Sequence, residues 1–124
     1  MNVYDSSALI ELLDQTKKGK KIQQKLSNTL INTTAINIHE LLVGAENKKE
    51  IFLLQGLFRT FNILSFNASA AEFSALIEQN LKKEGKKVKD ADLFISAICL
   101  QHKATLITCD KDFKKVNGLD LIIF

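Results

Sequence analysis

The chain alternates short apolar or β-branched runs with longer segments of helical hydrophobic spacing, and this alternation limits its fold more than any other feature. The strand-like runs cover residues 1–4, 29–34, 63–66, 104–109 and 119–124. Helical spacing covers residues 8–13, 17–26, 48–61, 68–84 and 91–102, a helix capped by Asn37 carries Glu40, and a short helical turn is expected at 111–115. The order predicts an α/β fold with a mainly parallel sheet of about five strands flanked by helices.

Length and composition predict one folding unit over residues 1–124. A chain of 124 residues with 46% hydrophobic residues can bury a real core, and proline and low-complexity stretches that would mark a linker are absent. No apolar run approaches the roughly 20 residues of a membrane span, so we expect a cytoplasmic protein without membrane contact. Cys99 and Cys109 form no CxxC pair and are expected to be free thiols without a chemical role.

Carboxylates occur where the apolar runs end or the helices begin. They are Asp5, Glu40, Asp92, Asp110 and Asp112. Each one alone can be a helix cap, and Glu40 is expected in a first helical turn. Together they indicate a metal site, because buried acids need a positive partner and Mg²⁺ and Mn²⁺ prefer carboxylate oxygen. In a parallel sheet such acids meet beyond the carboxyl ends of the strands, and without metal their mutual repulsion should raise the pKa of one of them.

Other catalytic classes fit the sequence less well. His39 and His102 are expected at surface or helix-end positions, which disfavours a metal-free mechanism with paired histidines. No aspartate occurs between Asp14 and Asp90, which removes the mid-chain phosphoacceptor of receiver domains. Asp5-Ser6-Ser7 lacks the second aspartate, two residues on, of haloacid-dehalogenase-type phosphatases.

Four motifs, in order along residues 1–124, resemble those of PIN-domain ribonucleases, and in particular the small VapC-type toxins. They are Tyr4-Asp5-Ser6-Ser7-Ala8-Leu9-Ile10, Glu40-Leu41-Leu42-Val43-Gly44, Asp92-Leu93-Phe94-Ile95-Ser96-Ala97, and Thr108-Cys109-Asp110-Lys111-Asp112-Phe113 followed by Gly118-Leu119. The resemblance implies a single PIN domain, a parallel α/β sandwich with its acids gathered at one end of the sheet. It also implies hydrolysis of RNA with Mg²⁺ or Mn²⁺.

The resemblance also implies residue roles. Asp5, Glu40 and Asp92 match the three core acids and Asp110 the more variable fourth, so these four would bind metal. Asp112 is expected to be an accessory acid, and Thr108, Ser6 and Ser7 would be hydroxyls that support the acids or a water. Metal ions suit the reaction because they generate a nucleophile from water and neutralise charge on phosphate oxygens. The number of metals and the identity of the general base stay open.

The resemblance further implies three partners, which are an RNA substrate, a cognate antitoxin and a second copy of the chain in a homodimer. Lys86, Lys87 and Lys89 directly precede Asp92 and could hold RNA phosphates. A second basic cluster is read as a solvated face; it comprises Lys17, Lys18, Lys20, Lys21 and Lys25. The phenylalanines of residues 51–66 fit either core or interface. The alternative function is a catalytically silent PIN-like module that binds RNA or serves as a scaffold.

Overall fold

Within residues 1–26 and 30–124, which the computed structural model describes, the chain forms one sheet of five parallel strands in the order β3-β2-β1-β4-β5. The strands are β1 (Asn2–Tyr4), β2 (Asn32–Thr34), β3 (Asn62–Leu64), β4 (Thr105–Thr108) and β5 (Asp120–Ile123). The predicted α/β class and parallel sheet are confirmed. The strand expected over 29–34 begins only at Asn32, and residue 29 itself lies outside the described residues.

Helices fill the connections between the strands. They are α1 (Ser6–Leu13), α2 (Lys17–Lys25), α3 (Ala35–Val43), α4 (Lys48–Phe58), α5 (Ala68–Lys83), α6 (Asp90–Gln101) and the 3₁₀ helix η1 (Lys111–Lys115). Side-chain oxygens cap several of them in the usual way, by accepting the backbone N–H three residues on; these caps are Thr16, Thr34, Asn47 and Asn67. None of the described helices has the length and apolar character to cross a bilayer.

The start of α3 differs from the prediction. The side chain of Thr34 accepts the backbone N–H of Asn37 at 3.2 Å, so the helix begins three residues earlier than an Asn37 cap would allow. Glu40 is therefore the sixth residue of α3, and the expectation that it lies in a first helical turn is wrong. The shift leaves the Asn37 side chain within the helix and free to make other contacts.

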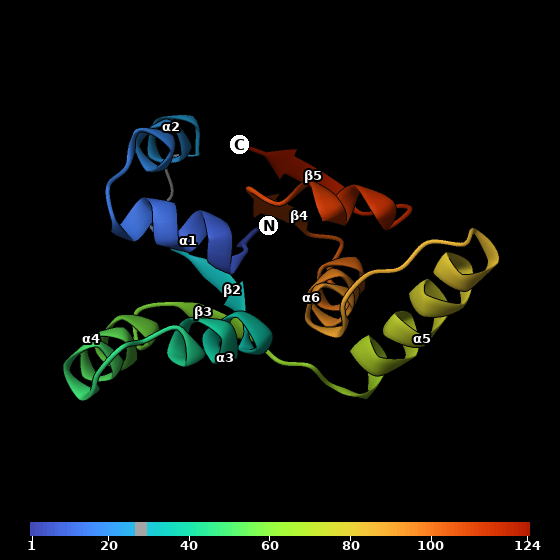
Figure 1. Cartoon of the computed structure of the whole chain (residues 1–124), viewed down its shortest axis with the longest axis horizontal. Coiled ribbons are helices and arrows are strands. Elements are labelled where there is room, and N and C mark those ends of the chain that lie inside the picture. The colour runs from blue at the N-terminus through green and yellow to red at the C-terminus, as the bar shows by residue number, and fades with distance from the viewer. Residues whose placement is uncertain (27–29) are drawn as a thin grey trace.

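The helices form two layers, one on each face of the sheet. Tyr4 and Ile107 pack in a cluster with side chains of α1 to α4, whereas Val3 and Leu106 pack against α5, α6 and η1. Figure 1 shows these two groups of helices on opposite sides of the strands. Right-handed crossovers explain the arrangement, because the chain adds β2 and β3 on one side of β1 and then returns to place β4 on the other.

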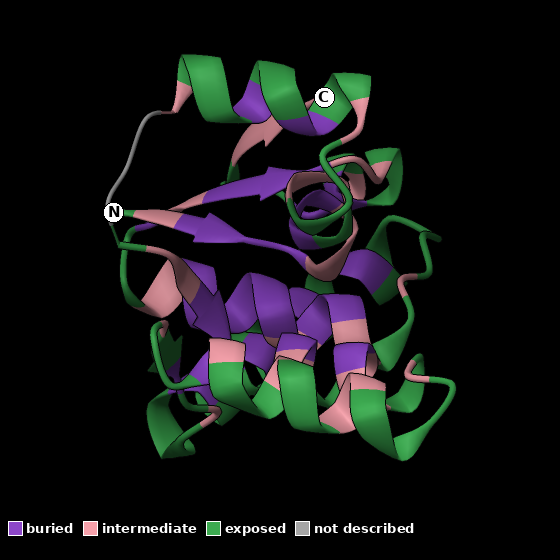
Figure 2. Cartoon of the chain, turned by 90° about the vertical axis from the view of Figure 1, so that its left-hand side faces the viewer, coloured by how far each residue is buried: buried purple, intermediate pink, exposed green. Residues whose placement is uncertain are grey.

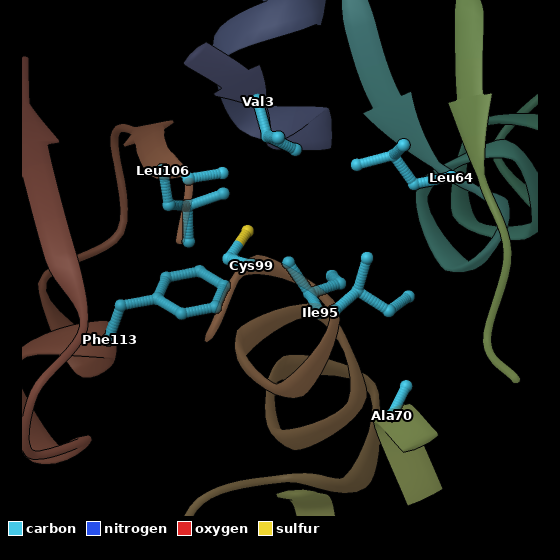
Figure 3. Close-up of a cluster of buried hydrophobic side chains, with 9 residues drawn as sticks. Val3, Leu64, Ala70, Ile95, Cys99, Leu106 and Phe113 are labelled. Atoms are coloured by element: carbon cyan, nitrogen blue, oxygen red, sulfur yellow. The ribbon is translucent and has the colours of Figure 1, made fainter. Parts of the chain in front are cut away.

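The helix α6 lies in the centre of the molecule, and its residues 93–100 are apolar except for Ser96. Ile95, Ile98 and Cys99 are 0% exposed, and Figure 3 shows Ile95 and Cys99 facing Val3 and Leu106 of the sheet, with Phe113 closing one side. Burial of side chains of this size stabilises the fold by roughly 1.5–3 kcal/mol each. Both cysteines are free thiols, as expected, and burial raises the pKa of Cys99 to about 12. Figure 2 shows the exposed residues on the outer faces of the helices.

The strand order places a topological switch point at the carboxyl ends of β1 and β4. The connections that leave β1 and β4, which are neighbours, run to opposite faces, and such a switch point is where ligands bind in open parallel sheets. Asp5 directly follows β1 and Asp110 lies two residues beyond β4. Because α6 leads back into a parallel strand, its first turn, which contains Asp92, lies toward the same edge.

Candidate active site

Asp5 lies at the switch point and is only 5% exposed. Its Oδ2 atom accepts hydrogen bonds from the Ser7 hydroxyl at 2.7 Å and the Thr108 hydroxyl at 2.8 Å. Its Oδ1 atom accepts a bond from Asn37 Nδ2 at 3.0 Å. The donors come from α1, β4 and α3, so the carboxylate of Asp5 joins three segments that are distant in sequence.

Glu40 projects from α3 toward the start of α1 and is half-buried. The Ser6 hydroxyl donates to Glu40 Oε1 at 2.9 Å, and Asn37 Nδ2 approaches the same oxygen at 3.4 Å. Asn37 Nδ2 also donates to Ser6 Oγ at 2.9 Å. Two of the three hydroxyls expected to support the acids, Ser6 and Ser7, thus contact different carboxylates.

Asp92 is 3% exposed, and burial is the main reason that its pKa is raised to about 7. Lys89, whose Nζ lies 3.9 Å from Asp92 Oδ1, opposes the increase, while the negative charges of Asp5, Asp110 and Glu40 add to it. The prediction of one raised pKa is confirmed, although burial contributes more than the predicted repulsion. Within the described part of the chain, Asp92 Oδ2 is buried without a hydrogen-bond partner.

The two acids after β4 differ in their surroundings. Asp110 is half-buried, and its Oδ1 accepts the backbone N–H of Asp112 at 2.9 Å. The backbone N–H of Asp110 donates to Thr108 Oγ1 at 3.1 Å, which ties it to the hydroxyl that holds Asp5. Asp112 is exposed and its Oδ1 lies 3.6 Å from Lys115 Nζ. Of the two, Asp110 is the one whose charge raises the pKa of Asp92.

This donor set suits a hard divalent cation. In the described residues no group of three or more His, Cys, Asp and Glu side chains is close enough to hold a metal ion as it stands. Mg²⁺ does not need such a cage, because it keeps several waters and is usually bound through one or two carboxylates. The unpartnered Oδ2 of Asp92, surrounded by three further acids that act on its pKa, is the observation that fits a bound cation best.

The basic and imidazole side chains can now be placed. Lys89 alone among the three loop lysines is paired with a site acid, since Lys86 Nζ pairs with Glu84 at 2.9 Å. Lys86, Lys87 and Lys89 are all exposed, which is compatible with phosphate binding. His39 and His102 are exposed, as the sequence predicted.

Sequence reasoning missed one buried polar residue that contacts the candidate site acids and a second that bonds to the backbone of Asp92. Asn37 was taken for a helix cap, yet its amide contacts Asp5, Ser6 and Glu40. The signal was its spacing, because residues three apart share a helix face with one another. Ser96, four residues after Asp92, donates its hydroxyl to the Asp92 backbone carbonyl at 2.7 Å and was not singled out.

A groove adjoins the acids. Its volume is about 620 Å³ and it runs between α1, α3 and α4; the lining includes Ile10, Leu13, Leu53, Leu54 and Leu57, with Glu40 among its polar members. The core expectation holds for Phe58, which is buried, whereas Phe52 is 74% exposed and its expected role at an interface stays a prediction. An apolar groove that opens beside a candidate site acid is a surface to which a partner can bind.

Comparison with known proteins gives a consistent result. Residues 3–119 match the PIN domain family. The chain is 25% identical over 123 residues to a protein named Ribonuclease VapC5 from Mycobacterium tuberculosis, covering 94% of this chain and 87% of that protein. Its fold resembles the structure of VapBC-1 from nontypeable Haemophilus influenzae, with a TM-score of 0.84, 24% identity and coverage of 98% and 96%. It also resembles a toxin-antitoxin complex from Klebsiella pneumoniae, with a TM-score of 0.79, 25% identity and coverage of 98% and 96%.

Proposed function

The chain belongs to the PIN domain family, and from this premise we propose that it is a metal-dependent endoribonuclease, the toxin of a VapBC-type toxin-antitoxin pair. The observation that carries the proposal is Asp92 Oδ2, which is buried without a hydrogen-bond partner among the described residues and lies where the charges of Asp5, Glu40 and Asp110 raise the pKa of Asp92. A relative named as a ribonuclease supports the reaction class. We treat residues 1–124 as a single PIN domain in the cytoplasm, where RNA is available.

Each carboxylate has a distinct part in the proposed site. Asp5, Glu40, Asp92 and Asp110 would hold Mg²⁺ or Mn²⁺, which when bound activates water and neutralises charge on the phosphate. Ser6, Ser7 and Thr108 hold the carboxylates of Asp5 and Glu40 in fixed orientations through the bonds described above. Asp112 stays accessory, because its carboxylate is exposed and pairs with Lys115.

The reaction can be tested directly. Purified protein is incubated with total RNA in Mg²⁺ or Mn²⁺ and in chelator, beside the variants Asp92→Asn and Asp90→Asn. Asp90 is the matched control, because it is an exposed acid in the same helical turn. We expect cleavage by the wild type and by Asp90→Asn only with metal, and at least a hundredfold less by Asp92→Asn. Cleavage that persists in chelator or in Asp92→Asn would refute the proposed mechanism.

The same samples distinguish the alternative, a silent RNA-binding or scaffolding module. Such a module would retard RNA in a gel without shortening it, under every metal condition. Four neighbouring acids lower the stability of the fold through desolvation and mutual repulsion, and a protein that used none of them would gain nothing in return. For this reason we favour catalytic cleavage of RNA over silent binding. Binding without cleavage in Mn²⁺ would reverse this preference.

An antitoxin is the partner that we propose for the groove beside Glu40. The groove is apolar and ends at a proposed catalytic acid, so a peptide lying in it would also obstruct the site. The similar Klebsiella structure is described as a toxin-antitoxin complex. Co-expression with the product of the neighbouring gene tests this: Leu53→Glu, in the groove, should abolish co-purification, and Leu76→Glu, a comparably exposed leucine on α5, should not. We also propose that the chain forms a homodimer, and analytical ultracentrifugation would measure its mass in solution.

A further inference from the structure

The amide of Asn37 is a fully buried polar group that contacts the proposed site without being one of the proposed metal ligands. The side chain is 0% exposed. It comes from the first turn of α3 rather than from the helix cap, and it lies between Asp5, which follows β1, and Glu40, about one turn further along α3. A buried amide is costly unless its donors and acceptor are all satisfied, so its contacts are informative.

The orientation of this amide is fixed by Thr34. The Thr34 hydroxyl oxygen accepts the backbone N–H of Asn37 at 3.2 Å, and the hydroxyl donates its proton to Asn37 Oδ1 at 2.7 Å. Because the carbonyl oxygen of the amide is held by this donor, the NH₂ group must face the other way, toward the carboxylates. The helix cap and the amide orientation therefore depend on one hydroxyl.

The NH₂ group then links two of the proposed metal-binding acids. It donates to Asp5 Oδ1 at 3.0 Å and to Ser6 Oγ at 2.9 Å, and Ser6 in turn donates to Glu40 Oε1 at 2.9 Å. Asn37 is the only hydrogen-bond donor to Asp5 Oδ1 among the described residues. Removal of the amide would leave Asp5 Oδ1 unpaired and would release Ser6 from its donor.

We propose that Asn37 is a positioning residue, whose amide holds Asp5 and Glu40 in the relative orientation at which both can bind one divalent cation. This inference rests on the proposed function. A donor that lies between two carboxylates keeps them together in the absence of metal without neutralising either. Groups that orient metal ligands in this way typically contribute tenfold to hundredfold to metal affinity.

The test is a titration of the full chain with Mn²⁺ alone, followed by calorimetry, together with ribonuclease kinetics and thermal unfolding. Asn37→Ala should weaken Mn²⁺ binding at least tenfold and lower kcat similarly, while KM for RNA changes less than about twofold. Asn37→Ser loses less volume and is too short to span the two acids; it should show the same pattern and carries the test if Asn37→Ala does not fold.

The matched control is Thr33→Val. Thr33 is also 0% exposed, and its hydroxyl donates to the Tyr4 carbonyl at 2.8 Å, so the variant loses a buried hydrogen bond but contacts no carboxylate. A purely structural role for Asn37 predicts that both positions lower the melting temperature and leave Mn²⁺ affinity unchanged, and this result would overturn the inference. If the wild type itself neither binds Mn²⁺ nor cleaves RNA, the proposed function fails instead.

Discussion

At the scale of single residues, Asp92 is subject to two opposed effects. It lies in the first turn of α6, where the helix dipole favours negative charge. Burial acts in the opposite direction and is stronger, because the pKa is raised from the usual 3.8 to about 7 despite Lys89 nearby. The dipole effect is worth only about 0.3–1 kcal/mol at most helix ends, whereas a desolvated carboxylate costs several times more. The proposed cation would offset this cost and favour the ionised form of Asp92.

This imbalance predicts a pH-dependent stability of the metal-free protein. An acid whose pKa is higher in the folded state stabilises the fold fully below pH 3.8, and this contribution is lost as pH rises through 7. Asp92→Asn removes the ionisable group, so in chelator it should be more stable than the wild type at pH 8 by on the order of 4 kcal/mol. The difference should shrink toward pH 5. Urea unfolding at the two pH values measures it.

Asp90→Asn is the control for this measurement, because it removes an exposed acid from the same turn of α6. Its effect on the free energy of unfolding should be within about 0.5 kcal/mol at both pH values. A stability difference between wild type and Asp92→Asn that does not vary with pH would show that the Asp92 carboxyl titrates normally in the folded protein.

At the scale of elements, the loop between α5 and α6 is held against the segment that precedes β5. Asn117 Nδ2 donates to Glu84 Oε1 at 2.6 Å and Lys115 Nζ donates to the Lys87 carbonyl at 3.4 Å. The first of these contacts, after that of Lys86, helps to lower the pKa of Glu84. The loop therefore presents its lysines at a defined place beside the first turn of α6.

We predict that this loop binds RNA phosphates. Simultaneous replacement of Lys86, Lys87 and Lys89 by glutamine should weaken RNA binding in chelator at least tenfold at low salt. It should also reduce the slope of log affinity against log salt by about 2, since each phosphate contact on a single strand contributes about 0.7. The matched control makes the same charge change on α2, at Lys20, Lys21 and Lys25, and should leave most of the slope intact. Equal effects of the two triple variants would mean that the loop has no special role.

Two helical glycines provide a test of how α1 and α2 pack. A Cβ atom on Gly19 of α2 would overlap the backbone carbonyl of Glu11 in α1, whereas a Cβ atom on Gly56 of α4 would meet nothing within 4 Å. Gly19→Ala should therefore destabilise the protein by about 2 kcal/mol or more, because a backbone must move. Gly56→Ala should stabilise it by about 0.5–1 kcal/mol through helix propensity. Urea unfolding of both variants measures these changes in the free energy of unfolding. If Gly19→Ala left the free energy of unfolding unchanged, α1 and α2 could move apart at little cost.

At the scale of the whole molecule, the sequence predicted the fold better than the detail of the site. The alternation of strands and helices was sufficient for the parallel sheet, because apolar periodicity and connection length depend on local sequence. The order β3-β2-β1-β4-β5 depends on the point at which the chain returns across β1 and adds β4 on its other side. No single segment of the sequence encodes that point. The burial of α6 is consistent with its sequence, because residues 93–100 are apolar except for Ser96.

The contacts within the site could not be read in the same way. Asn37 and Thr34 are both good helix caps by type, and only the structure shows that Thr34 takes the cap and frees the Asn37 amide for Asp5. The bond between Thr108 and Asp5 joins residues 103 positions apart in sequence, and it forms because β1 and β4 are neighbours. The choice of Asp92 as the acid with the raised pKa depends on its burial, which is a property of the assembled layers.

Binding of metal should be visible in the stability of the whole chain. A cation that binds only the folded state stabilises it by about 2.7 kcal/mol at one hundred times its dissociation constant, which corresponds to a rise in melting temperature on the order of 10 °C for a chain of this size. We predict such a rise for the wild type with Mn²⁺ at pH 8. The rise should be smaller at pH 5.5, because there Asp92, with its pKa of about 7, must first lose a proton.

The variants make the thermal measurement specific to the site. Asp90→Asn should show the same Mn²⁺-dependent rise as the wild type, because its side chain is exposed and is not one of the proposed ligands. Asp92→Asn should have the higher melting temperature in chelator at pH 8, and this temperature should rise little with Mn²⁺. Added metal should therefore reduce or reverse the difference in melting temperature between the variant and the wild type. This change in the difference between the two melting temperatures is expected only if the buried charge that destabilises the metal-free protein is also the charge that binds the cation. Equal gains in the wild type and in Asp92→Asn would instead place the cation elsewhere on the protein.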